Sequence, residues 1–160
     1  MILIPVDNIA RRFNPFKSPV WTETPLSEDD VCACLERGHW KYGSKPEHCG
    51  IYSYHVARVA YLVRHPAHDP IQIDVGVPVL NYVPRWPIID GNHRLAAAIY
   101  REAPSIAASI AGQLDYAEHL FGVDCQEPEF AGKPLVSAQK PCYNRIAGGF
   151  AAKSGPFHLV

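Results

Sequence analysis

Apolar and polar side chains alternate along residues 71–75, and this period of two predicts a β-strand with one buried face. Apolar runs at 2–6 and 106–110 predict two more strands. Pro5 places the first of these at the edge of a sheet, because proline has no N–H to donate to a central ladder. The segment 77–82 is expected to pair with 71–75 as a hairpin.

Apolar positions at helical spacing predict helices elsewhere in the chain. The clearest helix has an apolar stripe at i, i+3, i+4 and i+7 and is ended by Pro66. That stripe consists of Val56, Val59, Ala60 and Val63. Another helix begins at Ser27, which forms a capping pair with Asp30, and it ends at Gly38. Asp115 is expected to cap a further short helix.

These elements predict an α+β protein with a small mixed sheet and flanking helices. At 160 residues and 48% hydrophobic content, the chain is large enough for one domain with a substantial core. We expect this domain to span residues 1–125. Residues 126–160 are expected to form an irregular, basic C-terminal extension, because residues 131–160 contain lysines and an arginine but no acidic side chain.

Charge and cysteine content narrow the class of protein. The formal net charge is −1, so any contact with nucleic acid needs a local basic patch. No basic leader precedes an apolar run, and no 18 apolar residues follow one another, which predicts neither a signal peptide nor a membrane span. Five cysteines, an odd number, fit reduced thiols rather than a disulfide framework. A cytoplasmic protein is expected.

The most informative segment is a strand that ends in a glycine turn and opens into a helix. The strand is predicted at 87–90, and Gly91 permits a left-handed backbone at the turn. Asn92 is expected as the N-cap of a helix whose first turn carries His93 and Arg94. A helix N-terminus has N–H groups without partners and a partial positive charge, so phosphate is its natural ligand.

This segment resembles the signature of the ParB/sulfiredoxin superfamily. The resemblance rests on residues 88–98, Ile-Ile-Asp-Gly-Asn-His-Arg-Leu-Ala-Ala-Ala. In element order it extends over roughly residues 1–121, starting with a strand at 2–6 that continues through 7–9. The family includes DNA-partition proteins, sulfiredoxins, free-amino-acid kinases and proposed nucleases, and it implies that nucleotide phosphates are held at the turn.

The sequence departs from two members of that superfamily. Sulfiredoxins have a cysteine in the turn where this chain has Asn92, so their thiol chemistry is not expected here. Partition proteins have a different, arginine-rich motif and continue into a DNA-binding domain and a dimerisation domain. The chain ends before either would fit, so a complete partition protein is not expected.

By position, the resemblance implies roles for the residues of the turn. His93 and Arg94 would contact phosphate oxygens, and Arg94 can do so with two parallel hydrogen bonds. Asp90 would hold a Mg²⁺ ion that bridges the phosphates of a nucleoside triphosphate, or act as a base. Asn92 would cap the helix or bind phosphate beside Gly91. The alternative is structural: Asp90 and Asn92 satisfy backbone donors while Arg94 pairs with a carboxylate.

The predicted loop between Gly38 and Gly50 offers a second catalytic group. Glu47, next to His48, is the candidate, because phosphoryl transfer and phosphodiester hydrolysis both need a carboxylate or imidazole beyond the phosphate-binding groups. The leading interpretation is therefore a nucleotide- or phosphate-binding protein that performs one of these reactions. One alternative is a non-enzymatic DNA-associated module of phage or plasmid type. Another is a regulatory protein that retains the fold but has lost the catalytic activity.

Three weaker patterns allow other ligands. A cysteine and histidine cluster raises the possibility of zinc, although its spacing is poor and ordinary thiols are the alternative. The cluster comprises Cys32, Cys34, His39, His48, Cys49 and His55. Trp21, Trp40 and Trp86 can stack on a base or pack in the core, and Trp86 is expected at the core or its rim. The basic extension at 131–160 can contact a nucleic-acid backbone or remain a solvated tail.

Overall fold

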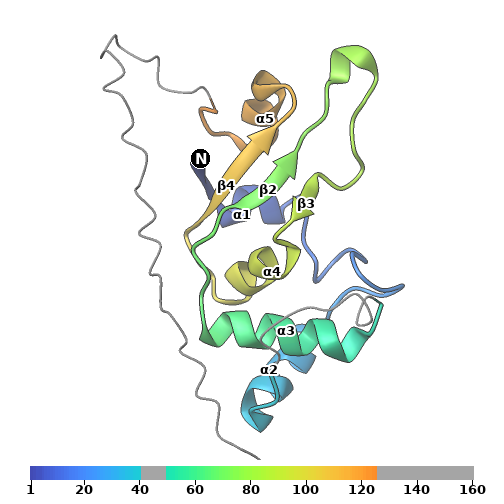
Figure 1. Ribbon diagram of the computed structural model, residues 1–160, viewed down its shortest axis with the longest axis vertical. Coiled ribbons are helices and arrows are strands. Elements are labelled where there is room, and N and C mark those ends of the chain that lie inside the picture. Colours follow the sequence, from blue (N-terminus) through green and yellow to red (C-terminus); the bar gives the residue numbers. More distant parts are fainter. Residues whose placement is uncertain (41–49, 126–160) are drawn as a thin grey trace, which may run out of the picture. The chain divides into compact units, whose positions relative to one another are not determined.

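The computed structural model describes residues 1–40 and 50–125, and its four strands form a single mixed sheet (Figure 1). The strands are β1 (Ile2–Pro5), β2 (Ile71–Asp74), β3 (Ile88–Asp90) and β4 (Ser105–Ala111). Their spatial order is β1-β4-β2-β3. The central strands β2 and β4 are parallel, and the outer strands pair antiparallel to them.

Alternation of side chains gives the sheet one buried face. Ile4, Ile71 and Ile73 are almost fully buried, while Leu3 and Gln72, which lie between such positions, are exposed. The register places Ile4 beside Ile106 across the first pair of strands. The apolar face is therefore continuous across the sheet, as the period of two along the chain requires.

Five α-helices and one short 3-10 helix complete the described fold: α1 (Val6–Ala10), α2 (Glu28–Arg37), α3 (Tyr52–Arg64), η2 (Pro78–Leu80), α4 (Asn92–Tyr100) and α5 (Leu114–Phe121). In Figure 1, α4 lies between the sheet and α3, and α2 lies beyond α3. Leu95 of α4 belongs to the core beneath the sheet. Ala96 and Ala97 belong to a second core formed with α2 and α3. The start of α4 is thus fixed from two sides.

The predicted α+β class is confirmed, as are most of the predicted elements. The strand at 2–6 is an edge strand, and those at 71–75 and 106–110 occupy the centre. The hydroxyl of Ser27 accepts a hydrogen bond from the N–H of Asp30, and α2 ends at Gly38 in the left-handed conformation. Caps and periodicity are local signals, so the sequence carries them directly. The described residues belong to one compact unit, and the predicted extension at 126–160 lies outside them.

Three predicted elements differ from the structure. The segment 77–82 is no hairpin partner, because both edges of β2 are already occupied; it forms η2 and an isolated bridge instead. The strand does not continue through 7–9, where α1 buries Val6 and Ile9 at helical spacing. Asp115 lies in the first turn of α5 rather than at its cap. Among the described residues, no helix is long and apolar enough to span a membrane.

Gly91→Ala is expected to reduce the free energy of unfolding by about 2–4 kcal/mol. Gly91 has φ +90°, and a Cβ there would lie 2.5 Å from Cγ2 of Ile71. Gly38→Ala is the matched control, because Gly38 also has a positive φ of +69° but a Cβ would meet no atom within 4 Å. We expect it to cost about 1 kcal/mol. Urea denaturation measures both losses, and equal losses would contradict the close approach of Ile71.

Candidate functional site

The N-terminus of α4 opens into a cavity of about 410 Å³. Gly91 is the N-cap, and its carbonyl accepts the first hydrogen bond of the helix from Leu95 at 2.9 Å. The N–H groups of the first turn therefore have no acceptor within the helix. Polar and aromatic side chains from separate segments surround this end of the helix: Trp21, Arg58, Asp69, Asp90, Asn92, His93 and Arg94.

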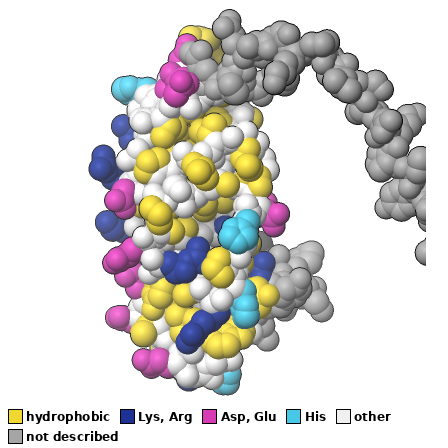
Figure 2. Space-filling model, turned by 90° about the vertical axis from the view of Figure 1, so that its left-hand side faces the viewer, with side chains coloured by type: hydrophobic (Ala, Val, Ile, Leu, Met, Phe, Trp, Pro, Cys, Tyr) yellow, Lys and Arg dark blue, Asp and Glu magenta, His cyan; other side chains and the backbone are white. Residues whose placement is uncertain are grey.

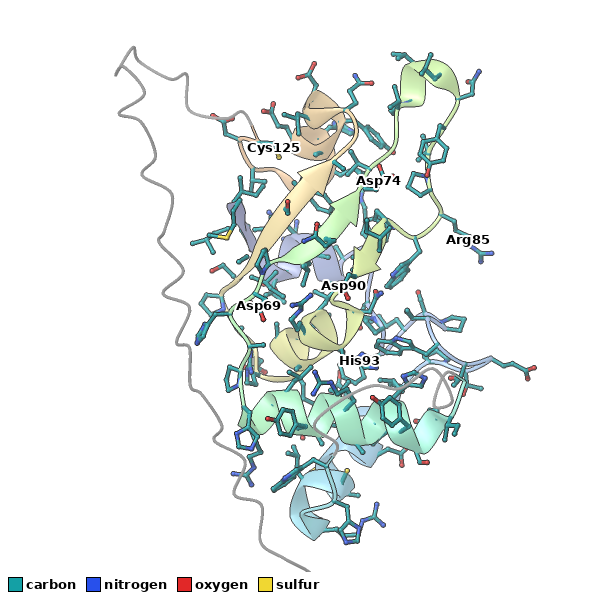
Figure 3. All side chains as sticks on the ribbon, in the orientation of Figure 1. Asp69, Asp74, Arg85, Asp90, His93 and Cys125 are labelled. Carbon is teal, nitrogen blue, oxygen red and sulfur yellow. The ribbon has the colours of Figure 1, made fainter. Side chains whose placement is uncertain are left out.

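Arg94 is held between two carboxylates at the edge of this cavity. Its guanidinium donates to Oδ2 of Asp90 at 2.8 Å and lies 3.9 Å from Oδ2 of Asp69. The Arg94 side chain is only 18% exposed, whereas those of Asp69 and Asp90 are 84% and 71% exposed. Ion pairs with such exposed partners contribute little, so a phosphate can replace them at small cost. Figure 3 shows both aspartates near α4.

Asn92 has a different place from the expected one. It is the first residue of α4 and not its cap, because its side-chain amide is engaged elsewhere. Oδ1 accepts a hydrogen bond from the indole of Trp86 at 2.7 Å, and Nδ2 donates to the carbonyl of Ile88 at 3.1 Å. The amide thereby ties the start of α4 to the end of β3. Trp86 lies at the rim of the core, as predicted, edge-on to Phe13.

His93 faces two aromatic neighbours at the cavity wall. Trp21 stacks on its ring with centroids 4.4 Å apart, and Nε2 of His93 lies 2.9 Å from Nδ1 of His55. Burial, reinforced by the charges of His55 and Arg58, lowers the pKa of His93 from 6.5 to about 3. The imidazole is therefore neutral near pH 7. It can offer a hydrogen bond to a ligand but no positive charge.

His55 is the buried partner of this pair. It is 3% exposed, and Trp21 stacks on its ring as well, at 5.1 Å. Burial lowers the pKa of His55 too. One of the two rings must donate its proton across the contact, and Nε2 of His55 has no hydrogen-bond partner among the described residues. The donor is best assigned to Nδ1 of His55, because an unpaired acceptor costs less when buried than an unpaired N–H.

Arg58 and Asp69 are site residues that the sequence analysis did not identify. Arg58 follows His55 by three positions on α3, so one face of that helix places Arg58 at the cavity and His55 against His93. The sequence signal that could have identified Arg58 is a cationic side chain between the apolar positions of a buried helix. Asp69 lies in the connection between α3 and β2, where no local pattern marks it. His55 was noted only as a member of the cysteine and histidine cluster.

The structure describes only some of the other predicted candidates. Glu47 and His48 lie outside the described residues, as does Cys49. Cys32 is exposed, whereas Cys34 is buried with its thiol donating to the carbonyl of His39 at 2.6 Å. Across residues 1–40 and 50–125, no group of three or more histidine, cysteine or acidic side chains is placed to hold a metal ion.

Comparison with known proteins gives no relative for this chain. No protein-family model matches it, no curated protein is similar in sequence, and no solved structure is similar in fold. The interpretation of the site therefore depends on its own geometry and on the resemblance of residues 88–98 described above.

The neutral state of His93 predicts a loss of stability in acid. Because its pKa is about 3 when folded and near 6.5 when unfolded, the unfolded chain alone binds this proton between those values. Stability should fall as pH drops from 6.5 toward 3. His93→Gln should lower the slope of unfolding free energy against pH by up to about 1.4 kcal/mol per unit, while His55 leaves a residual slope.

Urea denaturation between pH 7 and pH 4 measures this slope. The matched control is His119→Gln, which changes an exposed histidine of α5. We expect that control to follow the wild type. Equal slopes for His93→Gln and the wild type would show that His93 does not remain neutral in the folded protein.

Proposed function

We propose that this protein binds a nucleotide, or another phosphate-bearing ligand, through its phosphate at residues 91–94. The observation that carries the proposal is the cavity at the N-terminus of α4, which Arg58 of α3 and Arg94 of α4 both line. A helix N-terminus and converging guanidinium groups are the usual elements of a phosphate site. The cavity volume of about 410 Å³ lies within the range of small-molecule sites.

The N–H groups of the first turn would donate to phosphate oxygens together with Arg94. Binding requires Arg94 to exchange its carboxylate partners for phosphate, which its partly buried position and planar guanidinium favour. His93 adds a neutral wall and, through its ring, a hydrogen bond. Asn92 contributes by holding the turn in place against Trp86, and its amide would contact phosphate only by releasing that indole.

Asp90 is the residue that would hold Mg²⁺. Its carboxylate is exposed at the cavity edge, and magnesium is commonly bound by one or two carboxylates together with substrate phosphates. The ion would neutralise phosphate charge that Asp69 and Asp90 otherwise repel. Asp90 is also the candidate base for phosphoryl transfer or phosphodiester hydrolysis, with Glu47 as the second group predicted from the sequence. Measuring the turnover of a bound nucleotide tests whether Asp90 acts as this base.

A DNA-associated module is the alternative for the same turn. The resemblance to the ParB/sulfiredoxin superfamily is compatible with it, and the net charge of −1 restricts it to local contacts. The described site favours a small ligand, because its phosphate-binding groups lie in a cavity rather than along an open basic surface. A steep loss of duplex DNA binding with salt, without nucleotide binding, would favour the module.

Arg94→Met should weaken binding of ATP by roughly tenfold or more, because hydrogen bonds to a charged group are lost. Isothermal calorimetry measures the affinity, and thermal unfolding shows that the variant is folded. Arg85→Met removes an exposed arginine that points away from the site in Figure 3 and should bind like the wild type. Equal weakening in both variants would indicate only a general charge effect and would contradict the proposed site.

Asp90→Asn should remove most of the effect of magnesium on ATP binding. In the wild type, Mg²⁺ should strengthen ATP binding, because the ion bridges Asp90 and the phosphates. The variant should lose most of that gain, yet bind more tightly than the wild type in EDTA because a like charge is removed. Calorimetry with and without Mg²⁺ measures both effects. An unchanged magnesium gain would remove Asp90 as the metal ligand and leave the phosphate site intact.

A further inference from the structure

A second cavity, of about 270 Å³, adjoins the phosphate cavity. The two share four lining residues, Leu62, Ala67, Asp69 and Arg94. Arg94 therefore lies on the wall between them. A ligand whose phosphate contacts Arg94 can extend from one cavity into the other without leaving the protein surface.

One face of α4 forms the floor of this second cavity. Arg94, Ala97, Ala98 and Arg101 occupy positions i, i+3, i+4 and i+7 and all line it. With a rise of 1.5 Å per residue, the two arginines are about 10 Å apart along the helix. The alanines between them leave space that longer side chains would fill. The floor thus has a guanidinium at each end and a short apolar stretch between.

Arg101 has a backbone carbonyl, and no carboxylate, as its partner among the described residues. Its Nη1 donates to the carbonyl of Leu62 at 2.8 Å, and burial lowers its pKa. No carboxylate among the described residues forms an ion pair with it. A guanidinium carries five N–H groups, so the single carbonyl leaves most of its donor capacity for a ligand. The fold keeps this cation half-buried beside a cavity and not in open water.

The walls of the second cavity combine apolar side chains with polar ones, among them His68, Asp69 and Ser105. Leu3 of β1 lines it although 67% exposed, and Ile106 and Ala107 of β4 lie opposite α4. Figure 2 faces this side of the molecule, on which basic and histidine side chains are scattered among apolar ones. The carboxylate of Asp69 disfavours a second phosphate by charge repulsion, while the apolar side chains suit the flat, weakly hydrated face of an aromatic ring.

We propose that the second cavity binds the nucleoside part of a nucleotide, with Arg101 donating hydrogen bonds to acceptors on the base. This inference rests on the proposed phosphate site. It adds that the two adjoining cavities together bind a nucleotide. The phosphates lie at the start of α4, the sugar passes Arg94, and the base lies in the second cavity between Arg94 and Arg101. Ring nitrogens and carbonyl oxygens of bases are acceptors that a guanidinium reads well.

The test compares nucleoside triphosphates with tripolyphosphate, which has the phosphates alone. Calorimetry in Mg²⁺ uses ATP, GTP, CTP and UTP against the wild type, Arg101→Met and Arg101→Lys. The wild type should bind at least one nucleotide about tenfold or more tightly than tripolyphosphate. Arg101→Met should reduce the affinity for that nucleotide to the affinity for tripolyphosphate. The affinity for tripolyphosphate itself should be unchanged. Arg101→Lys keeps the charge without the planar fork and should recover only part of the preference.

The outcomes separate this inference from the function on which it rests. Equal binding of tripolyphosphate and every nucleotide by the wild type overturns the nucleoside site and leaves the phosphate site standing. A loss of tripolyphosphate binding in Arg101→Met also overturns it, because Arg101 would then act on phosphate. Binding of neither probe overturns both proposals. Arg85→Met is the charge-matched control and should retain the wild-type preference, and thermal unfolding verifies that each variant is folded.

Discussion

The packing of α4 against two cores at once is the constraint on which the candidate site depends. Leu95 enters the core beneath the sheet, while Ala96 and Ala97 enter the core shared with α2 and α3. A helix anchored on two faces cannot rotate or slide without disturbing both. The direction of its first N–H groups and the place of Arg94 are consequently set by apolar burial remote from any ligand.

The polar groups around the site show how the fold balances charge. His55 and His93 stay neutral because burial opposes their protonation, and Trp21 covers both rings. Arg94 instead forms ion pairs with the exposed carboxylates of Asp69 and Asp90. Neutral groups thus occupy the interior wall, and ionic ones occupy the mouth. This separation keeps the interior free of uncompensated charge and leaves the ionic partners free to exchange with a ligand.

The sequence predicted the elements well where the signal was local. Periodicity located β2 and α3, an apolar run located β4, and glycine located the turn before α4. The sequence-based prediction failed where the role of a residue depends on neighbours in space. Asn92 is a favourable cap residue in isolation, but Trp86 and Ile88 form hydrogen bonds with its side-chain amide. Arg58 and Asp69 escaped notice for the same reason, since packing of α3 beside α4 brings them to a turn that lies more than twenty residues further along the chain.

The alanines of α4 have a consequence for the width of the site. Side chains at a helix interface act as spacers, and the smallest ones let two helix axes approach most closely. Ala96 and Ala97 face the core that α4 shares with α3, the helix that carries Arg58. Their size therefore sets the gap between the guanidinium groups of Arg58 and Arg94. A bulkier residue at Ala96, which lines neither cavity, would act as a wedge and would change ligand selectivity without contacting the ligand.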